Sequence, residues 1–247
     1  MDVTRSGMVV VPVQVNGAGP VRFLVDTGAT TTTLDAGFAT TLGLRAAGSL
    51  RIVTASGSVT APAGKIATLG VGGLDVRDLA VSWMPLDALR VEDERIMGVI
   101  GQDVLADLTV TIDYARRRVR FGSERCASGD MTMAVERSDR RPTVAARLRT
   151  PAGNREVRLV VDSGVNAMVL FERSAGSGNG VRLATHTGSA DAAFVSVATA
   201  TLAGLAVSGP AVALQPAEPR GEDGLLPASW FSRVCIDGPR AAAVLTR

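Results

Sequence analysis

Two short acidic motifs are the parts of this chain whose residue types and spacing could do chemistry. Asp26–Gly28 (DTG) follows the apolar run VRFLV, and Asp162–Gly164 (DSG) follows the similar run VRLVV. A lone motif of this kind is usually an Asx turn that closes a strand. Two such carboxylates facing each other cannot both ionise, so they share one proton. The ionised member can then take a proton from a water while the other hydrogen-bonds a carbonyl, which would hydrolyse an amide without metal or covalent intermediate.

The residues beside each aspartate suit this arrangement. Gly28 and Gly164 carry no side chain, so their backbone N–H groups can approach the carboxylates closely. Thr27 and Ser163 offer hydroxyls that can hydrogen-bond the opposite loop and tie the two turns together. We therefore expect these four residues to support a catalytic pair formed by Asp26 and Asp162.

The second half of the chain repeats the order of parts in the first. The segment GVIGQDVLADLTVTIDYARRRVRF in the first half corresponds to GLLPASWFSRVCIDGPRAAAVLT in the second. Asp26 precedes Asp113 by 87 residues, and Asp162 precedes Asp237 by 75. This spacing indicates an internal duplication. The polar stretch Gly122–Asp130 predicts the boundary, which gives lobes at 1–124 and 131–247 and lets the two aspartates meet about a pseudo-two-fold axis.

The elements that must position these motifs are mainly strands. Short alternating or apolar runs recur between glycine turns, which predicts an all-β fold with one or two short helices in each lobe. The expected turns and helices are a hairpin turn at Asn16-Gly17, a hairpin tip at Ser56-Gly57, a helix between an Asp35 N-cap and Gly43, a short helix over Gln102–Asp107, and a solvated hairpin turn at Arg116–Arg118.

The composition excludes several classes of function. A net charge of +2 with scattered arginines gives no reason to expect a nucleic acid partner, and the 46% apolar content is that of an ordinary globular protein. His186 is the only histidine, so we expect no His-based zinc site, no metal and no cofactor. Cys126 and Cys235 could form one disulfide or remain two buried thiols, and the thiols are the preferred interpretation.

The expected partner is a peptide or protein substrate, bound by a monomer with an internal pseudo-dimer. No stretch is long enough to be a transmembrane helix. The first residues, MDVTRSG, lack a signal pattern. The location is therefore expected to be cytoplasmic, or extracytoplasmic if a signal peptide has been removed.

Several motifs resemble the bacterial members of the retropepsin-like aspartic protease family. FLVDTGATTTTL, VIGQDVL and VTIDYARRRVRF cover nearly all of the first half, and VVDSG, GLLP and VCIDG match the second half more loosely. Retropepsins are homodimers in which each chain contributes one aspartate, whereas pepsin-like enzymes hold two lobes in one chain. This chain resembles a single-chain tandem of two retropepsin-like lobes.

The resemblance implies a role for each matching position. Asp26 and Asp162 would be the catalytic dyad, with Thr27 and Ser163 linking the loops. The segments packed beneath them would be Val99, Ile100 and Gly101 in the first lobe and Leu225 and Leu226 in the second. The substrate-covering flap would be the hairpin tip with Thr54, Ala55, Ser56 and Gly57, and a second flap would lie at His186, Thr187 and Gly188.

The second lobe departs from the family pattern. Val165 follows the second motif where the family prefers a small residue, and Asn166 stands in place of Thr30. Pro227 occupies the position of the supporting glycine, where it removes an N–H and fixes φ. Asp113 and Asp237 are interpreted as structural, and Asp103 as a helix-start cap.

Three functions remain open. The first is an endopeptidase with an intramolecular dyad, which we predict, with apolar residues preferred beside the cut. The second is a peptide-binding pseudoprotease with a degenerate second lobe. The third is a protease whose dyad forms between two chains.

Overall fold

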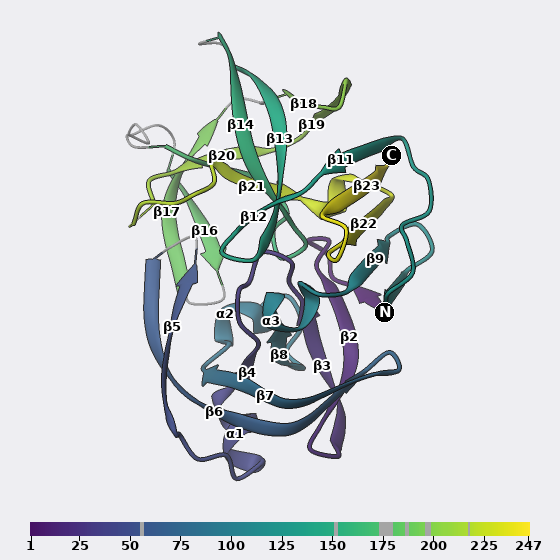
Figure 1. Ribbon diagram of the computed structural model, residues 1–247. Helices are drawn as coiled ribbons and strands as arrows, with labels where there is room; N and C mark the ends of the chain where they lie inside the picture. The colour runs from purple at the N-terminus through teal and green to yellow at the C-terminus, as the bar shows by residue number, and fades with distance from the viewer. Residues whose placement is uncertain (55–56, 151–152, 173–179, 186–187, 196–198, 217) are drawn as a thin grey trace.

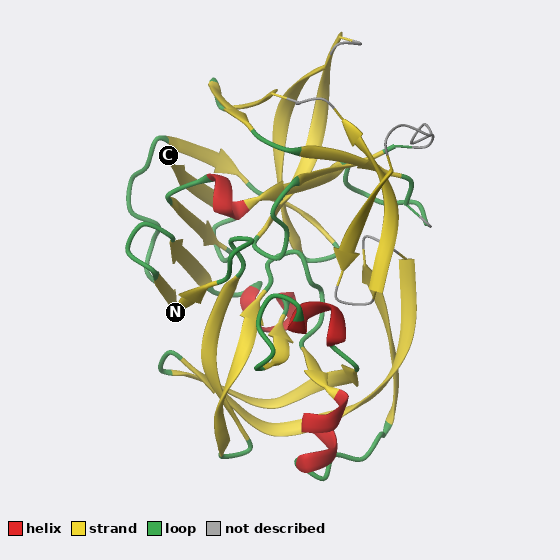
Figure 2. Cartoon of the chain, turned by 180° about the vertical axis from the view of Figure 1, so that it is seen from behind, coloured by secondary structure: helices red, strands yellow, loops and turns green. Residues whose placement is uncertain are grey.

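A computed structural model of the 247-residue chain shows two β-rich lobes joined at one side by a third sheet (Figures 1 and 2). It describes residues 1–54, 57–150, 153–172, 180–185, 188–195, 199–216 and 218–247. The helices of this described part are single short turns or little more, and the strands make up the body of both lobes. The predicted all-β, two-lobe fold is confirmed.

The first lobe is built on an eight-stranded sheet in the order β1-β2-β3-β8-β4-β7-β6-β5. Its strands are β1 (Asp2–Val3), β2 (Val9–Val15), β3 (Ala18–Val25), β4 (Thr33–Asp35), β5 (Gly48–Thr54), β6 (Gly57–Val71), β7 (Leu74–Met84) and β8 (Ile96–Ile100). Its helices are α1 (Ala36–Thr41), α2 (Asp87–Arg90) and α3 (Gln102–Leu105).

The second lobe is built on a ten-stranded sheet. Its path runs β16-β17-β20-β15-β21-β14-β13-β18-β19, and β12 pairs with β13. The strands are β12 (Glu136–Ser138), β13 (Arg141–Thr150), β14 (Gly153–Asp162), β15 (Met168–Phe171), β16 (Gly180–Thr185), β17 (Gly188–Val195), β18 (Thr199–Leu202), β19 (Leu205–Ser208), β20 (Ala211–Leu214) and β21 (Gly224–Pro227), and the 3-10 turn η1 spans Ala228–Trp230.

The same pairing pattern occurs in both lobes. In the first, β3 runs parallel to β8, and β4 runs antiparallel to β8 and parallel to β7. In the second, β14 runs parallel to β21, and β15 runs antiparallel to β21 and parallel to β20. Each aspartate motif therefore leaves its sheet at the same place, after β3 in one lobe and after β14 in the other.

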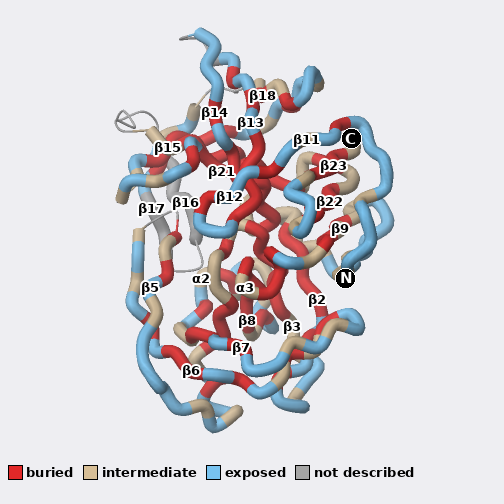
Figure 3. The backbone as a smooth tube through the Cα atoms, in the orientation of Figure 1, coloured by how far each residue is buried: buried red, intermediate tan, exposed pale blue. Residues whose placement is uncertain are grey.

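Each lobe has its own apolar core (Figure 3). Phe23 and Leu34 lie fully buried in the first lobe, and Leu159 and Phe231 do so in the second. The strands that carry Phe23, Leu34 and Leu159 are buried continuously at these positions, as strands covered on both faces are. Burial of both cores fixes the strands that end at the two aspartates.

A third, five-stranded sheet is formed from both halves of the chain. Its order is β10-β9-β22-β23-β11, with β9 (Thr109–Asp113), β10 (Arg118–Gly122), β11 (Met131–Ala134), β22 (Arg233–Asp237) and β23 (Ala242–Thr246). The central pairing of β9 with β22 places Ile112 opposite Val234. The two halves are therefore joined by backbone hydrogen bonds as well as by the linking residues.

The expectation of two buried thiols is wrong, because Cys126 and Cys235 form a disulfide. Cys235 lies on β22, and the connection between β10 and β11 brings Cys126 beside it, with the two Cα atoms 5.7 Å apart. The pairing of strands from both halves creates this proximity, which no local pattern in the sequence indicates.

Reduction of this disulfide is expected to lower the free energy of unfolding by about 2–4 kcal/mol, because the bond closes a long loop in the unfolded chain. The two cysteines are 109 residues apart. Urea unfolding with and without dithiothreitol measures the difference. A Cys126→Ser, Cys235→Ser double variant should not respond to the reductant; if it responds as strongly as the unmodified chain, the effect does not come from this bond.

Most of the expected local elements are present. Asp35 caps α1 by accepting hydrogen bonds from the N–H groups of Gly37 and Phe38, and Gly43 beyond the helix has φ +66°. The turn at Asn16-Gly17 joins β2 and β3, and the arginine turn joins β9 and β10. The helix expected over Gln102–Asp107 ends at Leu105, and α2 was not predicted.

Candidate active site

The two aspartates lie at equivalent ends of parallel strand pairs. Asp26 follows β3, and its N–H donates to the carbonyl of Ile100 at 3.1 Å. In the register, Leu24 and Val25 lie opposite Val99 and Ile100, while Val160 and Val161 lie opposite Leu225 and Leu226. The predicted supporting segments are therefore β8 and β21, each hydrogen-bonded to the strand that carries an aspartate.

The two carboxyl groups face each other across the lobes. A Cβ atom built on Gly28 would lie 2.2 Å from Oδ2 of Asp162, and one built on Gly164 would lie 2.6 Å from Oδ2 of Asp26. The two side chains also hydrogen-bond each other. Both residues are buried, with 6% of Asp26 and 5% of Asp162 exposed. Each carboxyl group therefore occupies the space that the opposite glycine leaves open.

Backbone N–H groups of the two loops hold the carboxyl groups in place. Gly28 and Ala29 donate to Oδ1 of Asp26 at 2.8 and 3.0 Å, and Gly164 donates to Oδ1 of Asp162 at 2.7 Å. Burial, and next the charge of Asp26, raise the pKa of Asp162 well above that of an ordinary aspartate. The Gly164 hydrogen bond opposes this shift. Asp162 therefore keeps its proton to a higher pH than a solvent-exposed aspartate does.

The hydroxyls of Thr27 and Ser163 link the two loops in a reciprocal network. Thr27 Oγ1 donates to the carbonyl of Val161 at 2.7 Å, and Ser163 Oγ donates to the carbonyl of Val25 at 2.7 Å. The N–H of each residue donates to the hydroxyl of the other, at 3.1 and 3.0 Å. All of these hydrogen bonds are buried. They therefore hold the two loops that carry the aspartates in a fixed relative position.

Thr27→Val is expected to lower the free energy of unfolding by roughly 2–6 kcal/mol, because it leaves two buried backbone groups unpaired at about 1–3 kcal/mol each. These groups are the Val161 carbonyl and the Ser163 N–H. Valine keeps the shape of threonine, so packing changes little. Thr30→Val is the matched control, since the Thr30 hydroxyl has only a 3.5 Å contact with Thr31. Equal losses in the two variants, measured by urea unfolding, would contradict the prediction.

Gln102 supports the first loop and was not singled out from the sequence. Its Nε2 donates to the carbonyl of Thr27 at 2.7 Å, and the side chain is buried. Its counterpart after Pro227 is Ala228, which has no side-chain donor. The only signal in the sequence is the place of Gln102 directly after Gly101. The second loop lacks this hydrogen bond, so the two lobes support their aspartates differently.

The interpretation of Asp103 as a helix-start cap is wrong. Gly101 occupies the N-cap position of α3, and Asp103 lies inside the helix. Its two carboxylate oxygens accept from the N–H and the hydroxyl of Thr32, both at 2.7 Å. Burial raises the pKa of Asp103. Both carboxylate oxygens of Asp103 are thus used by Thr32. Asp103 therefore holds the segment that follows the DTG motif against α3.

The predicted flap residues are only partly within the described structure. Thr54 ends β5 and lies opposite Gly57, the first residue of β6. Gly188 begins β17 and lies opposite Thr185 of β16. Both predicted flaps are therefore the ends of two-stranded hairpins. The remaining predicted flap residues, Ala55, Ser56, His186 and Thr187, lie outside the described residues.

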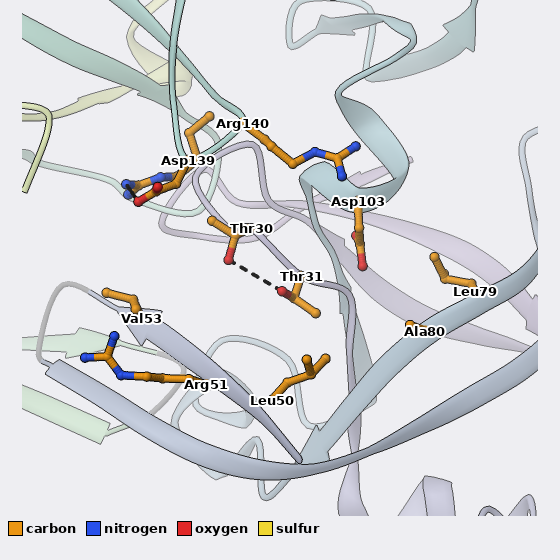
Figure 4. A pocket seen from close by; sticks show the side chains of 11 residues that line it. Thr30, Thr31, Leu50, Arg51, Val53, Leu79, Ala80, Asp103, Asp139 and Arg140 are labelled. Carbon is orange, nitrogen blue, oxygen red and sulfur yellow. Dashed lines mark hydrogen bonds and ion pairs between the residues drawn. The ribbon is translucent and has the colours of Figure 1, made fainter. Parts of the chain in front are cut away.

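A pocket of about 640 Å³ adjoins the first loop and is lined by both lobes (Figure 4). Figure 4 shows Thr30 and Thr31 between the β5 residues Leu50 and Val53 on one side and Arg140 on the other. The remaining lining residues are Arg51, Leu79, Ala80, Asp103, Asp139 and Arg141. The lining combines apolar side chains, such as Leu50 and Leu79, with charged ones, such as Arg140 and Asp103.

Comparisons with known proteins find an aspartyl protease family over part of the chain and a similar fold over most of it. Residues 11–104 match the sequence profile of a family described as aspartyl protease. The aspartic proteinase of Irpex lacteus has a similar structure, with a TM-score of 0.57 and 14% identity over 96% of this chain and 93% of that one. A retropepsin-like aspartic protease from Rickettsia conorii matches with a TM-score of 0.31 and 20% identity over 42% of this chain and 72% of that one. No curated protein matches the sequence.

The predicted resemblance to retropepsin-like aspartic proteases is supported by a family match over residues 11–104, and the similarity over the rest of the chain is one of fold. Within the described residues, the helices are too short and too polar for any of them to span a bilayer.

Proposed function

We propose that this chain, an aspartic protease by the sequence of its first lobe and by its fold, is an endopeptidase that uses Asp26 and Asp162 as a catalytic dyad. The substrate would be a peptide segment of a protein, bound in a cleft between the two lobes. The observation that carries the proposal is the approach of two buried, hydrogen-bonded carboxyl groups from equivalent loops of one chain.

The chemistry follows from the different states of the two carboxyl groups. The pair shares one proton, and the raised pKa of Asp162 favours its place on Asp162, which leaves its partner to act as the base. Asp26 takes a proton from a water as the water oxygen attacks the peptide carbonyl carbon, and Asp162 gives its proton to the carbonyl oxygen. The resulting diol returns a proton to Asp162 as the C–N bond breaks, and Asp26 passes its proton to the leaving nitrogen. Both carboxyl groups end in their starting states.

Cleavage is expected to depend on pH because only the singly protonated pair is active. As pH rises through the raised pKa of Asp162, both carboxyl groups ionise and the donor to the carbonyl oxygen is lost. As pH falls far enough to protonate both, the base is lost. We therefore expect a bell-shaped dependence of kcat/KM with its maximum in mildly acidic solution.

The test is digestion of a denatured protein between about pH 3 and 8, the range over which carboxylate dyads titrate. Mass spectrometry of the products identifies internal cuts, which distinguish an endopeptidase from an exopeptidase. Peptide binding without cleavage at every pH in that range would overturn the proposal and favour a pseudoprotease.

The pseudoprotease alternative has two observations in its favour. The second loop lacks the hydrogen bond that Gln102 gives the first, and Pro227 lies opposite Asp162 in the register. The interchain alternative has less support, because Asp26 already meets Asp162 within one chain. A mass measurement in solution separates it from the proposal, since an internal dyad needs no second copy.

A further inference from the structure

Each lobe sends a connecting segment toward the hairpin of the other lobe. In the first lobe this segment joins β7 to β8, and its helix α2 lies beside the backbone of β16. In the second lobe the equivalent segment joins β20 to β21, and it reaches the β5–β6 hairpin (Figure 1). The contacts of this second segment come from two side chains, Glu218 and Arg220.

Glu218 bridges the two strands of the β5–β6 hairpin. Its Oε1 accepts from the guanidinium of Arg51 on β5 and from the hydroxyl of Ser58 on β6, the latter at 2.8 Å. The Arg51 hydrogen bond, and next that of Ser58, lower the pKa of Glu218. An exposed ion pair by itself stabilises little. Here the ion pair of Glu218 with Arg51 adds to a second contact with the hairpin, which the largely buried side chain of Arg220 makes.

Arg220 makes the buried contact. Only 6% of its side chain is exposed, and its Nη2 donates to the carbonyl of Thr54, the last residue of β5. The guanidinium also lies 4.7 Å from the centre of the Phe171 ring and pairs with Glu222 at 3.4 Å. Charge-assisted hydrogen bonds are among the stronger ones in proteins. Arg220 is thus anchored in the second lobe while it binds the backbone of a first-lobe hairpin.

The contacts of Arg220 extend to a residue of the pocket that adjoins the first loop. Glu222 has no exposed side-chain surface, pairs with Arg141 at 2.9 Å and accepts from Ser138 Oγ at 2.7 Å. Arg141 lines the pocket together with Thr30. A continuous set of polar contacts therefore runs from the hairpin through Arg220 and Glu222 to Arg141. Removing the Arg220 donors would break it at the point where it crosses between lobes.

We propose that Arg220 is a positioning residue that holds the β5–β6 hairpin, the predicted flap, from the opposite lobe, and that Glu218 holds the same hairpin through Arg51 and Ser58. The effect of Arg220 on catalysis rests on the proposed function, whereas its effect on the hairpin does not. A hairpin fixed before the substrate arrives reduces the ordering that binding must otherwise supply.

Arg220→Met tests this inference, because methionine keeps an apolar stem beside Phe171 and removes every donor. Hydrogen–deuterium exchange of the β5–β6 amides is expected to be about tenfold faster in this variant, the effect of losing one hydrogen bond to a charged group. Arg147→Met is the matched control, since Arg147 pairs with Glu156 on the exposed surface of the second lobe. Glu218→Gln, at a more exposed site, should give a smaller increase in the same amides.

Kinetics give the second measurement. In Arg220→Met, kcat/KM for peptide cleavage is expected to fall by about tenfold, and Arg220→Lys should recover part of the loss. Unchanged β5–β6 exchange in Arg220→Met would overturn the inference, as would faster exchange accompanied by higher kcat/KM, which would make the contact inhibitory. If the unmodified protein cleaves nothing, the proposed function fails, and the exchange measurement still decides whether Arg220 holds the hairpin.

Discussion

Asp26→Asn and Asp162→Asn are each expected to lower kcat/KM for peptide cleavage by at least about 10²–10⁴-fold, the usual contribution of a general acid or base. Asparagine has nearly the shape of aspartate but can neither take a proton from water nor donate one from an acidic oxygen. Because the proposed mechanism needs both functions in each turnover, the two variants should be similarly inactive. Cleavage of a fluorogenic peptide at the optimal pH measures the loss.

Asp162→Asn should at the same time stabilise the protein near neutral pH. The pKa of Asp162 is raised in the folded state, so its contribution to stability is fully present below its unfolded pKa and is lost as pH rises through the folded value. Above that value the ionised carboxylate is buried beside Asp26, and asparagine removes this cost. Urea unfolding should therefore show a gain at pH 7 that shrinks in acidic solution.

Asp75→Asn is the control for both measurements. Asp75 lies on the exposed side of β7, so neither activity nor stability should change. Full activity in Asp162→Asn would contradict an internal dyad and favour one formed between two chains. Lower stability of Asp162→Asn at pH 7 would contradict the raised pKa, whatever happened to the activity.

Gly28→Ala is expected to lower kcat/KM by about 100-fold or more, the cost that a misplacement of about 1 Å can have at an active site. The added Cβ would lie 2.2 Å from Oδ2 of Asp162, so the carboxyl group must move away from its partner. Gly164→Ala should act in the same way on Asp26, where the distance is 2.6 Å. The motif thus requires glycine because the opposite carboxyl group needs the space.

Gly122→Ala provides the matched control, because a Cβ at that position meets no atom within 4 Å. Circular dichroism of all three variants checks that the fold is kept. Comparable activity in Gly28→Ala and Gly122→Ala would mean that the two carboxyl groups are not in contact during catalysis, and the proposed dyad would then be wrong.

The two lobes are similar in topology but not in the support of their loops. Gln102 and Asp103 bind the first loop, through Thr27 and Thr32. In the second lobe, Ala228 and Ser229 stand in the corresponding places after Pro227, and Ala228 has no polar side chain to offer the loop. The two loops are therefore held by different side chains, although the strands that carry them pair in the same way.

The sequence by itself determined the local features of this protein. The periodicity of apolar residues predicted the strands that end at Asp26 and Asp162, and short-range turn chemistry predicted the Asn16-Gly17 hairpin and the Asp35 cap. The repeated order of motifs predicted two similar lobes. These features depend on residues that are close together in the chain, so the sequence pattern alone is enough to predict them.

Only the tertiary structure decided the contacts between distant residues. The disulfide of Cys126 with Cys235 follows from the pairing of β9 with β22, and the hydrogen bond from Arg220 to Thr54 spans 166 residues. The roles of Asp103 and Gln102 likewise depend on which loop packs against α3. A buried polar side chain forms hydrogen bonds with the groups that the folded chain brings near it. The identity of these partners produces no periodic pattern in the sequence.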